Sequence, residues 1–136
     1  IVIIGGGSVG CETADYLAPL INDLFSTNRD ITLIEMTNGL MTGESGATKS
    51  LLTRRMMEKG VKIELNSKIT YVDETTIKYE KNNQEYVLND VDTLVFAVGY
   101  QPISSPIENA HLIGDCQKVG TLKDAISQAY QITREI

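Results

Sequence analysis

The chain has 136 residues, of which 42% are hydrophobic and 22% charged, and its formal charge at pH 7 is −6. This is the length of one ordinary domain, and its 11 glycines and 3 prolines exclude a disordered, collagen-like or low-complexity protein. No apolar run reaches the roughly 18 residues that a membrane helix needs, and the negative charge disfavours nucleic-acid phosphates. The two cysteines, Cys11 and Cys116, are too few and too far apart for a disulfide framework or a zinc site. We therefore expect a cytoplasmic protein with no nucleic-acid partner and no membrane partner.

Both ends of the sequence fall inside expected secondary structure. The sequence opens on the apolar run Ile1–Ile4, with no initiator methionine and no signal peptide, and it stops at Ile136 within a predicted helix. We therefore expect the chain to be a domain excised from a longer parent protein.

The first half of the chain predicts strands that alternate with helices, the pattern of an α/β fold. Pro19 should break the first helix, with one or two more helical turns at 20–25, and Gly60 stands where a C′ glycine belongs. The second helix would bury a stripe of Leu51, Leu52 and Met56. The expected elements are a strand at 1–4, a helix at 9–18, a strand at 31–35 and a helix at 47–59.

After Gly60 the hydrophobic period changes to that of short strands. Four runs, with turns at 74–75 and 82–83, predict a small antiparallel meander in place of a crossover helix. These runs lie at 61–65, 69–72, 76–80 and 85–88. The sequence thus predicts a Rossmann-like three-layer α/β domain with a central parallel sheet and a β-meander crossover.

The remaining sequence predicts two more buried strands, at 93–98 and 111–113, and a brief helical turn at 105–106. Because residues 99–110 are long enough for a parallel crossover, we expect 111–113 to pair beside 93–98 in the same sheet. Thr121 and Asp124 resemble a capping box that opens a helix at 121–136. The apolar stripe of this helix needs a partner surface; it consists of Leu122, Ala125, Ile126, Ala129, Tyr130 and Ile136.

A Gly-x-Gly-x-x-Gly motif, formed by Gly5, Gly7 and Gly10, follows the first strand and opens the first helix. A Gly-x-Gly-x-x-Gly motif between a strand and a helix is typical of a dinucleotide-binding site. Gly5 would permit the tight turn, Gly7 would let a pyrophosphate approach the backbone, and Gly10 would let the helix pack close to the strand. Around Ser8 and Val9 the helix N-terminus would offer unpaired N–H groups and a positive dipole end to the phosphates.

Glu35 stands at the end of the second strand, 25 residues after Gly10, a little further than the usual spacing of about 20. Its carboxylate would accept hydrogen bonds from both adenosine ribose hydroxyls and would repel a 2′-phosphate. The site should therefore prefer NAD(H) to NADP(H). The alternative is a glycine turn that only packs, beside an exposed glutamate.

Other reactive side chains are interpreted as structural. Cys11 lies in a helical first turn, where a thiol pKa is lowered, but the phosphate site needs that turn, so a packing role is preferred. Cys116 has no Cys-x-x-Cys partner, and His111 stands alone before a strand. Met56 and Met57 are assigned to the core. A solvated basic face near a helix C-terminus would be formed by Arg54, Arg55, Lys59 and Lys62.

The strings GGGSVGCETADYL, ITLIE, DTLVFAVGYQP, HLIGDC and GTLKDAISQAYQITREI resemble the nicotinamide-dinucleotide domain of flavoproteins with two dinucleotide-binding domains. The resemblance covers nearly all of the chain. It is closest to NADH:flavin oxidoreductases related to old yellow enzyme, among them 2-enoate reductases, 2,4-dienoyl-CoA reductases and trimethylamine dehydrogenase. In that family a flavin-bearing TIM barrel precedes an FAD-type domain, into which the nicotinamide-type domain is inserted.

The resemblance implies roles for further residues. The segment 97–102, with Gly99, would close over the dinucleotide, and Glu12 would lie near the nicotinamide. Gly114 and Asp115 would belong to the FAD-type domain, where the aspartate contacts the ribityl chain of the flavin. The implied division is an NAD(H)-binding domain at 1–103 and a strand–helix segment of the FAD-type domain at 104–136.

The function predicted from these features is to bind NADH and present its nicotinamide to a flavin of the parent enzyme, so that the cofactors carry out hydride transfer. No catalytic side chain and no metal site are expected. FAD is expected in the parent but not in this chain, which lacks the first glycine motif of the FAD-type domain and the barrel. The expected partner is the rest of the parent flavoprotein. Two alternatives are a non-catalytic NAD(H)-sensing module and a SAM-dependent methyltransferase, against which the meander and the second Gly-Asp motif argue.

Overall fold

The computed structural model describes residues 1–19, 29–103 and 107–135. These residues form two units, Ile1–Val98 and Gly99–Ile136, and each is described by itself. The further helical turn predicted at 20–25 and the turn predicted at 105–106 lie outside the described residues. None of the described helices is long and apolar enough to span a membrane.

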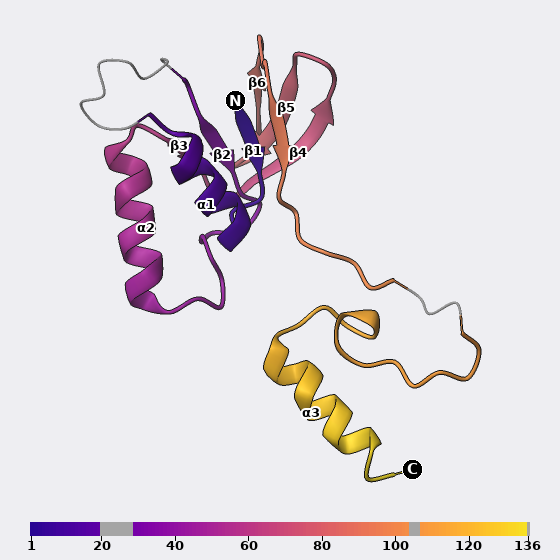
Figure 1. Ribbon diagram of the computed structural model, residues 1–136. Coiled ribbons are helices and arrows are strands. Elements are labelled where there is room, and N and C mark those ends of the chain that lie inside the picture. The colour runs from indigo at the N-terminus through magenta and orange to yellow at the C-terminus, as the bar shows by residue number, and fades with distance from the viewer. Residues whose placement is uncertain (20–28, 104–106, 136) are drawn as a thin grey trace. The chain divides into compact units, whose positions relative to one another are not determined.

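The first unit alternates strands and helices and then forms a run of short strands, as the sequence predicts (Figure 1). Its elements are β1 (Val2–Ile4), α1 (Ser8–Leu17), β2 (Thr32–Ile34), α2 (Gly46–Glu58), β3 (Lys62–Glu64), β4 (Ser67–Val72), β5 (Ile77–Lys81), β6 (Gln84–Leu88) and β7 (Leu94–Phe96).

The central sheet has four parallel strands in the order β3-β2-β1-β7. Its register places Ile3 opposite Leu33 on β2 and Val95 on β7. Because successive side chains of a strand point to opposite faces, Ile3 and Leu33 face one layer, while Val2 and Ile34 face the other. The strands read as continuous apolar runs because both faces are covered.

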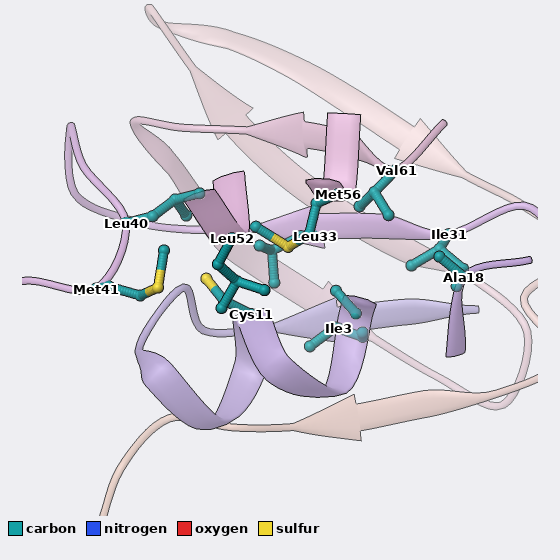
Figure 2. Close-up of a cluster of buried hydrophobic side chains, with 11 residues drawn as sticks. Ile3, Cys11, Ala18, Ile31, Leu33, Leu40, Met41, Leu52, Met56 and Val61 are labelled. Carbon is teal, nitrogen blue, oxygen red and sulfur yellow. The ribbon is translucent and has the colours of Figure 1, made fainter. Parts of the chain in front are cut away.

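One face of the sheet is covered by α1 and α2. Figure 2 shows Ile3 and Leu33 meeting Cys11 from α1 and Leu52 and Met56 from α2. All five side chains are buried. The full cluster contains Ile3, Cys11, Ala14, Ala18, Ile31, Leu33, Leu40, Met41, Leu52, Met56 and Val61.

The other face is covered by an antiparallel meander of β4, β5 and β6. Ile77 and Tyr79 of β5 are buried against Val2, Ile4 and Ile34 of the parallel sheet. The β5–β6 hairpin turns through Asn82 and Asn83, both with positive φ (53° and 60°), the pair of left-handed residues that tight hairpins require. The three-layer Rossmann-like fold and its meander are therefore confirmed.

A buried ion-pair cluster ties α1 to α2. Asp15 is only 8% exposed, and its two carboxylate oxygens accept hydrogen bonds from Nε and Nη2 of Arg55 at 2.7 and 2.6 Å. Lys59 Nζ donates to the Asp15 carbonyl at 2.7 Å and lies 3.1 Å from Oδ1. The prediction of a solvated basic face is therefore wrong for Lys59, whose side chain is 11% exposed. Arg55 is half exposed, as predicted, but it also pairs with Asp15.

Several details of the first unit also differ from prediction. The run at 61–65 becomes β3 of the parallel sheet, not a strand of the meander. In α2, Leu51 and Met57 are exposed, since only Leu52 and Met56 face the sheet. The strand predicted at 93–98 is short and half-buried because β7 is an edge strand, with Phe96 64% exposed.

The second unit contains the short 3-10 helix η1 (Gly114–Cys116) and α3 (Leu122–Ile132). The predicted capping box is confirmed, since Thr121 and Asp124 each bond the backbone N–H of the other. The predicted strand at 111–113 is wrong, because these residues have no regular secondary structure and belong to neither sheet. No residue of α3 is fully buried. Within the second unit Ala125 packs against Gly114 of η1, while Leu122, Ile126 and Tyr130 of the apolar stripe are exposed.

Candidate functional site

The turn between β1 and α1 requires glycines because other backbone segments approach it closely. Gly5 has φ +109°, and a Cβ there would collide with the carbonyl oxygen of Ala97, which follows β7. A Cβ on Gly10 would collide with the carbonyl oxygen of Gly5. Gly6 is restricted less severely, by side chains, because its Cβ would lie 2.6 Å from Leu40 Cδ2 and 2.9 Å from Glu35 Cβ. These three glycines hold the helix, two strand ends and the following loop together.

Gly7 differs from its neighbours because nothing lies within 4 Å of the position of its missing Cβ. It is exposed and is the N-cap of α1, with φ −69°, and no side chain caps the first-turn amides. Ser8, Val9 and Gly10 follow directly in the first turn. An open backbone at an uncapped helix N-terminus can receive an anion, because the amides and the helix dipole both favour negative charge.

Glu35 lies directly beside this turn. Its Oε2 accepts the Gly6 N–H at 2.6 Å, and its Oε1 accepts the Thr37 N–H at 2.7 Å. Burial alone would raise the pKa of this carboxyl, but the hydrogen bonds from Thr37 and Gly6 outweigh burial and hold its pKa below the usual value. Glu35 is therefore an ionised, oriented acceptor at the end of β2.

The loop between Glu35 and α2 is anchored to the glycine turn. Leu40 and Met41 are buried, and Met41, with φ 48°, donates its N–H to the Gly6 carbonyl at 2.7 Å. Further along the loop, the carboxylate of Glu44 accepts the Ser8 hydroxyl at 2.8 Å. The segment between Glu35 and α2 is polar and glycine-rich, and this composition gives no sign of the packing.

The predicted site residues of the second unit form a smaller, separate turn. Gly114 has φ +57° and donates its N–H to Gln128 Oε1 of α3 at 2.6 Å. Asp115 is exposed and accepts the Gly120 N–H at 3.1 Å. Gly99 has φ +91° and open space where its Cβ would be. The structure thus brings Gly5, Gly7, Ser8, Val9, Gly10 and Glu35 together and describes Gly99, Gly114 and Asp115 in the other unit.

A family model described as pyridine nucleotide-disulphide oxidoreductase matches residues 1–129. The chain belongs to this family. Among curated relatives, the cinnamate reductase of Clostridium sporogenes is 29% identical over the whole of this chain and 21% of its own length. The NADH oxidase of Thermoanaerobacter brockii is 23% identical with the same coverage. The chain therefore spans about a fifth of the length of these relatives.

Solved structures agree on the fold. A 2-naphthoyl-CoA reductase, in complex with 2-naphthoyl-CoA, superposes with a TM-score of 0.72 over 99% of this chain and 21% of its own. NDH2 from Plasmodium falciparum, in complex with NADH, superposes with a TM-score of 0.63 over 74% of this chain and 22% of its own. Both are 20% identical to this chain, so the likeness shows the shared architecture.

The family name raises the question of redox cysteines in this chain. Cys11 is fully buried in the core, and burial, together with the nearby charges of Glu35 and Glu12, raises the pKa of its thiol to about 11. A thiol with so high a pKa is a poor nucleophile, so the packing role is confirmed. Cys116 is exposed and free. Within the described ranges no group of three or more His, Cys, Asp or Glu residues could hold a metal ion.

Two features of the site region escaped sequence reasoning. Gly6 has little room for a Cβ, because Leu40 and Glu35 lie close to it, although it is a variable position of the motif. Glu44 reaches Ser8 across 36 positions of sequence, and no local pattern announces such a contact. Glu12, predicted near the nicotinamide, is an exposed residue of α1.

Proposed function

We propose that this chain is the NADH-binding domain of a flavin-dependent oxidoreductase related to old yellow enzyme. The observation that carries the proposal is the combination of an open, uncapped glycine turn at Gly7 with the fixed carboxylate of Glu35 beside it. A dinucleotide presents a pyrophosphate and a ribose diol, the two groups that a glycine turn and a strand-end carboxylate at the carboxyl ends of a parallel sheet bind. The names of the relatives, NADH oxidase and cinnamate reductase among them, support this choice.

The residues of this chain would bind and orient the dinucleotide. The amides of the first turn of α1 would hold the pyrophosphate, with Gly7 leaving room for its approach. Glu35 would accept the adenosine ribose hydroxyls. When bound, the nicotinamide supplies a hydride for the flavin of the parent enzyme. The chain needs no acid–base pair of its own for that role.

The preference for NADH over NADPH would follow from Glu35. Both carboxylate oxygens already accept backbone N–H bonds, so the charge cannot rotate away from a 2′-phosphate. Each oxygen has a further lone pair for a ribose hydroxyl. The site would thus accept a diol and reject an anion through the same two oxygens.

The parent enzyme would supply what the chain does not contain. We assign 1–103 to the NAD(H)-binding domain and 104–136 to an FAD-type domain, completed with a flavin-bearing TIM barrel from the parent. Gly99 would lie in the segment that closes over the dinucleotide, while Gly114 and Asp115 would serve the flavin side. The coverage of only about a fifth of each relative supports such an arrangement.

Titration of the 136-residue chain with NADH and NADPH tests the proposal. NADH should bind at least tenfold more tightly, and Glu35→Arg should reverse or abolish that preference. Glu74→Gln, which removes an exposed glutamate from the β4–β5 turn, is the matched control and should leave the ratio unchanged. Equal affinity for the two dinucleotides would refute the role of Glu35.

A further inference from the structure

The carboxylate of Glu44 occupies a position that no property of the glycine motif requires. It accepts the hydroxyl of Ser8, the first helical residue of α1, at 2.8 Å. The helix itself has no acidic residue in its first turn and no side-chain cap. A negative charge is favourable at a helix N-terminus, so Glu44 supplies from the loop the charge that α1 lacks.

The backbone that carries Glu44 is fixed close to the turn. Met41 and Leu40 are buried, Met41 donates to the Gly6 carbonyl, and the Glu44 N–H donates to the Met41 carbonyl at 3.1 Å. Two residues later, α2 begins, with Ser45 as its N-cap. These backbone contacts place Glu44 beside Ser8.

We propose that Glu44 acts as an internal competitor for the phosphate-binding end of α1 and sets the affinity of the site for dinucleotides. Its carboxylate contacts the same first turn that would receive the pyrophosphate, and the two anions repel each other. Binding must break the Ser8–Glu44 hydrogen bond and turn the carboxylate towards solvent. This inference rests on the proposed function, because it concerns the same site.

The electrostatic penalty has a predictable size. Two like charges a few ångströms apart in a solvated site repel enough to change an equilibrium constant roughly three- to tenfold, and the repulsion weakens with salt. Removing the charge of Glu44 should therefore tighten binding of any phosphate-bearing ligand of the site. It should also slightly destabilise the free chain, because the N-terminus of α1 loses one of the two carboxylates beside it, Glu44 and Glu35.

The test measures the dissociation constant of NADH for the full chain, for Glu44→Gln and for the control Glu74→Gln, at low and high salt. We expect Glu44→Gln to bind NADH roughly three- to tenfold more tightly at low salt, with a smaller gain at high salt. Its melting temperature should fall by about 1–3 °C. Glu74→Gln should match the unmodified chain in both measurements.

The outcomes separate the two proposals. If the unmodified chain binds NADH but Glu44→Gln binds it no better or more weakly, Glu44 is a bystander or a ligand contact, and this inference is wrong while the proposed function stands. If neither protein binds NADH, both proposals fail. Tighter binding with a lowered melting temperature supports the inference, because a merely structural role would move both quantities in the same direction.

Discussion

A glycine stands close before each of the helices α1 and α3, at Gly7 and at Gly120, but the two helices differ in how far their side chains are buried. In α1, four residues are buried, because the helix lies on the parallel sheet beside α2. In α3, no residue is buried, although Leu122, Ile126 and Tyr130 line one side of it. The first helix has a layer to cover, and the described part of the second unit provides none.

This difference shows which part of the fold is local. A capping box and a period of 3.6 residues suffice to form α3, since both depend only on neighbours in sequence. Burial requires a second surface. The large apolar side chains of α3 are exposed within the described unit, whereas Cys11 and Ala14 of α1 are buried in the core cluster on the sheet.

Truncating one isoleucine in each unit tests this difference in burial most directly. Ile3 is fully buried between helices and sheet, and Ile126 is 61% exposed. Ile3→Ala should lower the free energy of unfolding by about 3 kcal/mol, because it removes buried methyl groups and leaves a cavity. Ile126→Ala should change it by less than about 0.5 kcal/mol. Urea unfolding of both variants decides the matter, and a large loss in Ile126→Ala would mean that α3 is covered in solution.

Two glycines of the same motif should respond differently to an added methyl group. Gly10→Ala places its Cβ against the Gly5 carbonyl and should cost about 2 kcal/mol of folding free energy, since neither backbone can yield easily. Gly7→Ala meets open space and should cost less than about 1 kcal/mol, the usual effect at an N-cap, while weakening NADH binding. Thermal melts with and without NADH distinguish the two effects. Equal destabilisation would show that Gly7 serves only the backbone.

The ion-pair cluster between α1 and α2 should make the next largest contribution to the free energy of unfolding. Asp15→Asn would leave Lys59, whose side chain is 11% exposed, without its charge partner, and we expect a loss of about 1–2 kcal/mol, reduced because Arg55 is half exposed. Asp92→Asn, at an exposed aspartate, is the control and should be neutral.

The same cluster predicts a pH dependence of stability. Burial alone would raise the pKa of Asp15, but the hydrogen bonds from Arg55 and Lys59 hold it below the usual value. A group with a lowered folded-state pKa stabilises the protein above its unfolded pKa, near 3.9, and loses that contribution as the pH falls through the folded value. The difference between the unmodified chain and Asp15→Asn should therefore shrink below about pH 4. A difference that grows on acidification would contradict the arrangement.

The last prediction concerns the rates at which the two thiols react with a labelling reagent, which should perturb the protein least. At pH 8, a pKa of about 11 leaves about one thousandth of Cys11 as thiolate, and burial blocks access as well. Cys116 is exposed. One thiol per chain should react quickly with an aromatic disulfide reagent, and Cys116→Ser should abolish the fast phase. Fast labelling of Cys11 would show that α1 opens readily from the sheet.

Sequence patterns predicted most elements of the first unit, because its strands are short apolar runs and its turns carry marked residues. Asn82 and Asn83 fall in the predicted hairpin turn, and Gly60 ends α2 with φ +82° as a C′ glycine does. Glu35 was placed at a strand end and lies at one, beside the glycine turn. These features depend on contacts close in sequence or on a motif of fixed spacing.

The features that sequence patterns predicted wrongly or missed share a physical cause, because each depends on a contact between residues distant in the sequence. Residues 111–113 have an apolar pattern, but without a neighbouring strand that pattern does not make them a strand. Arg55 was predicted to lie on a solvated face, but it donates a hydrogen bond to Asp15, which is 40 positions away in the sequence. Leu40 and Met41 are buried in a loop for which the sequence pattern predicted no core residue. Burial of this kind is decided by tertiary packing, which periodicity does not encode.

The two backbone N–H bonds on Glu35 have a consequence for conformational entropy. A surface glutamate normally samples many rotamers, and ordering such a side chain on binding costs about 0.5–1.5 kcal/mol. Here Gly6 and Thr37 have already selected one rotamer during folding. A ligand that uses the remaining lone pairs of this carboxylate meets a rigid group, and the entropy of fixing it has been lost before the ligand arrives.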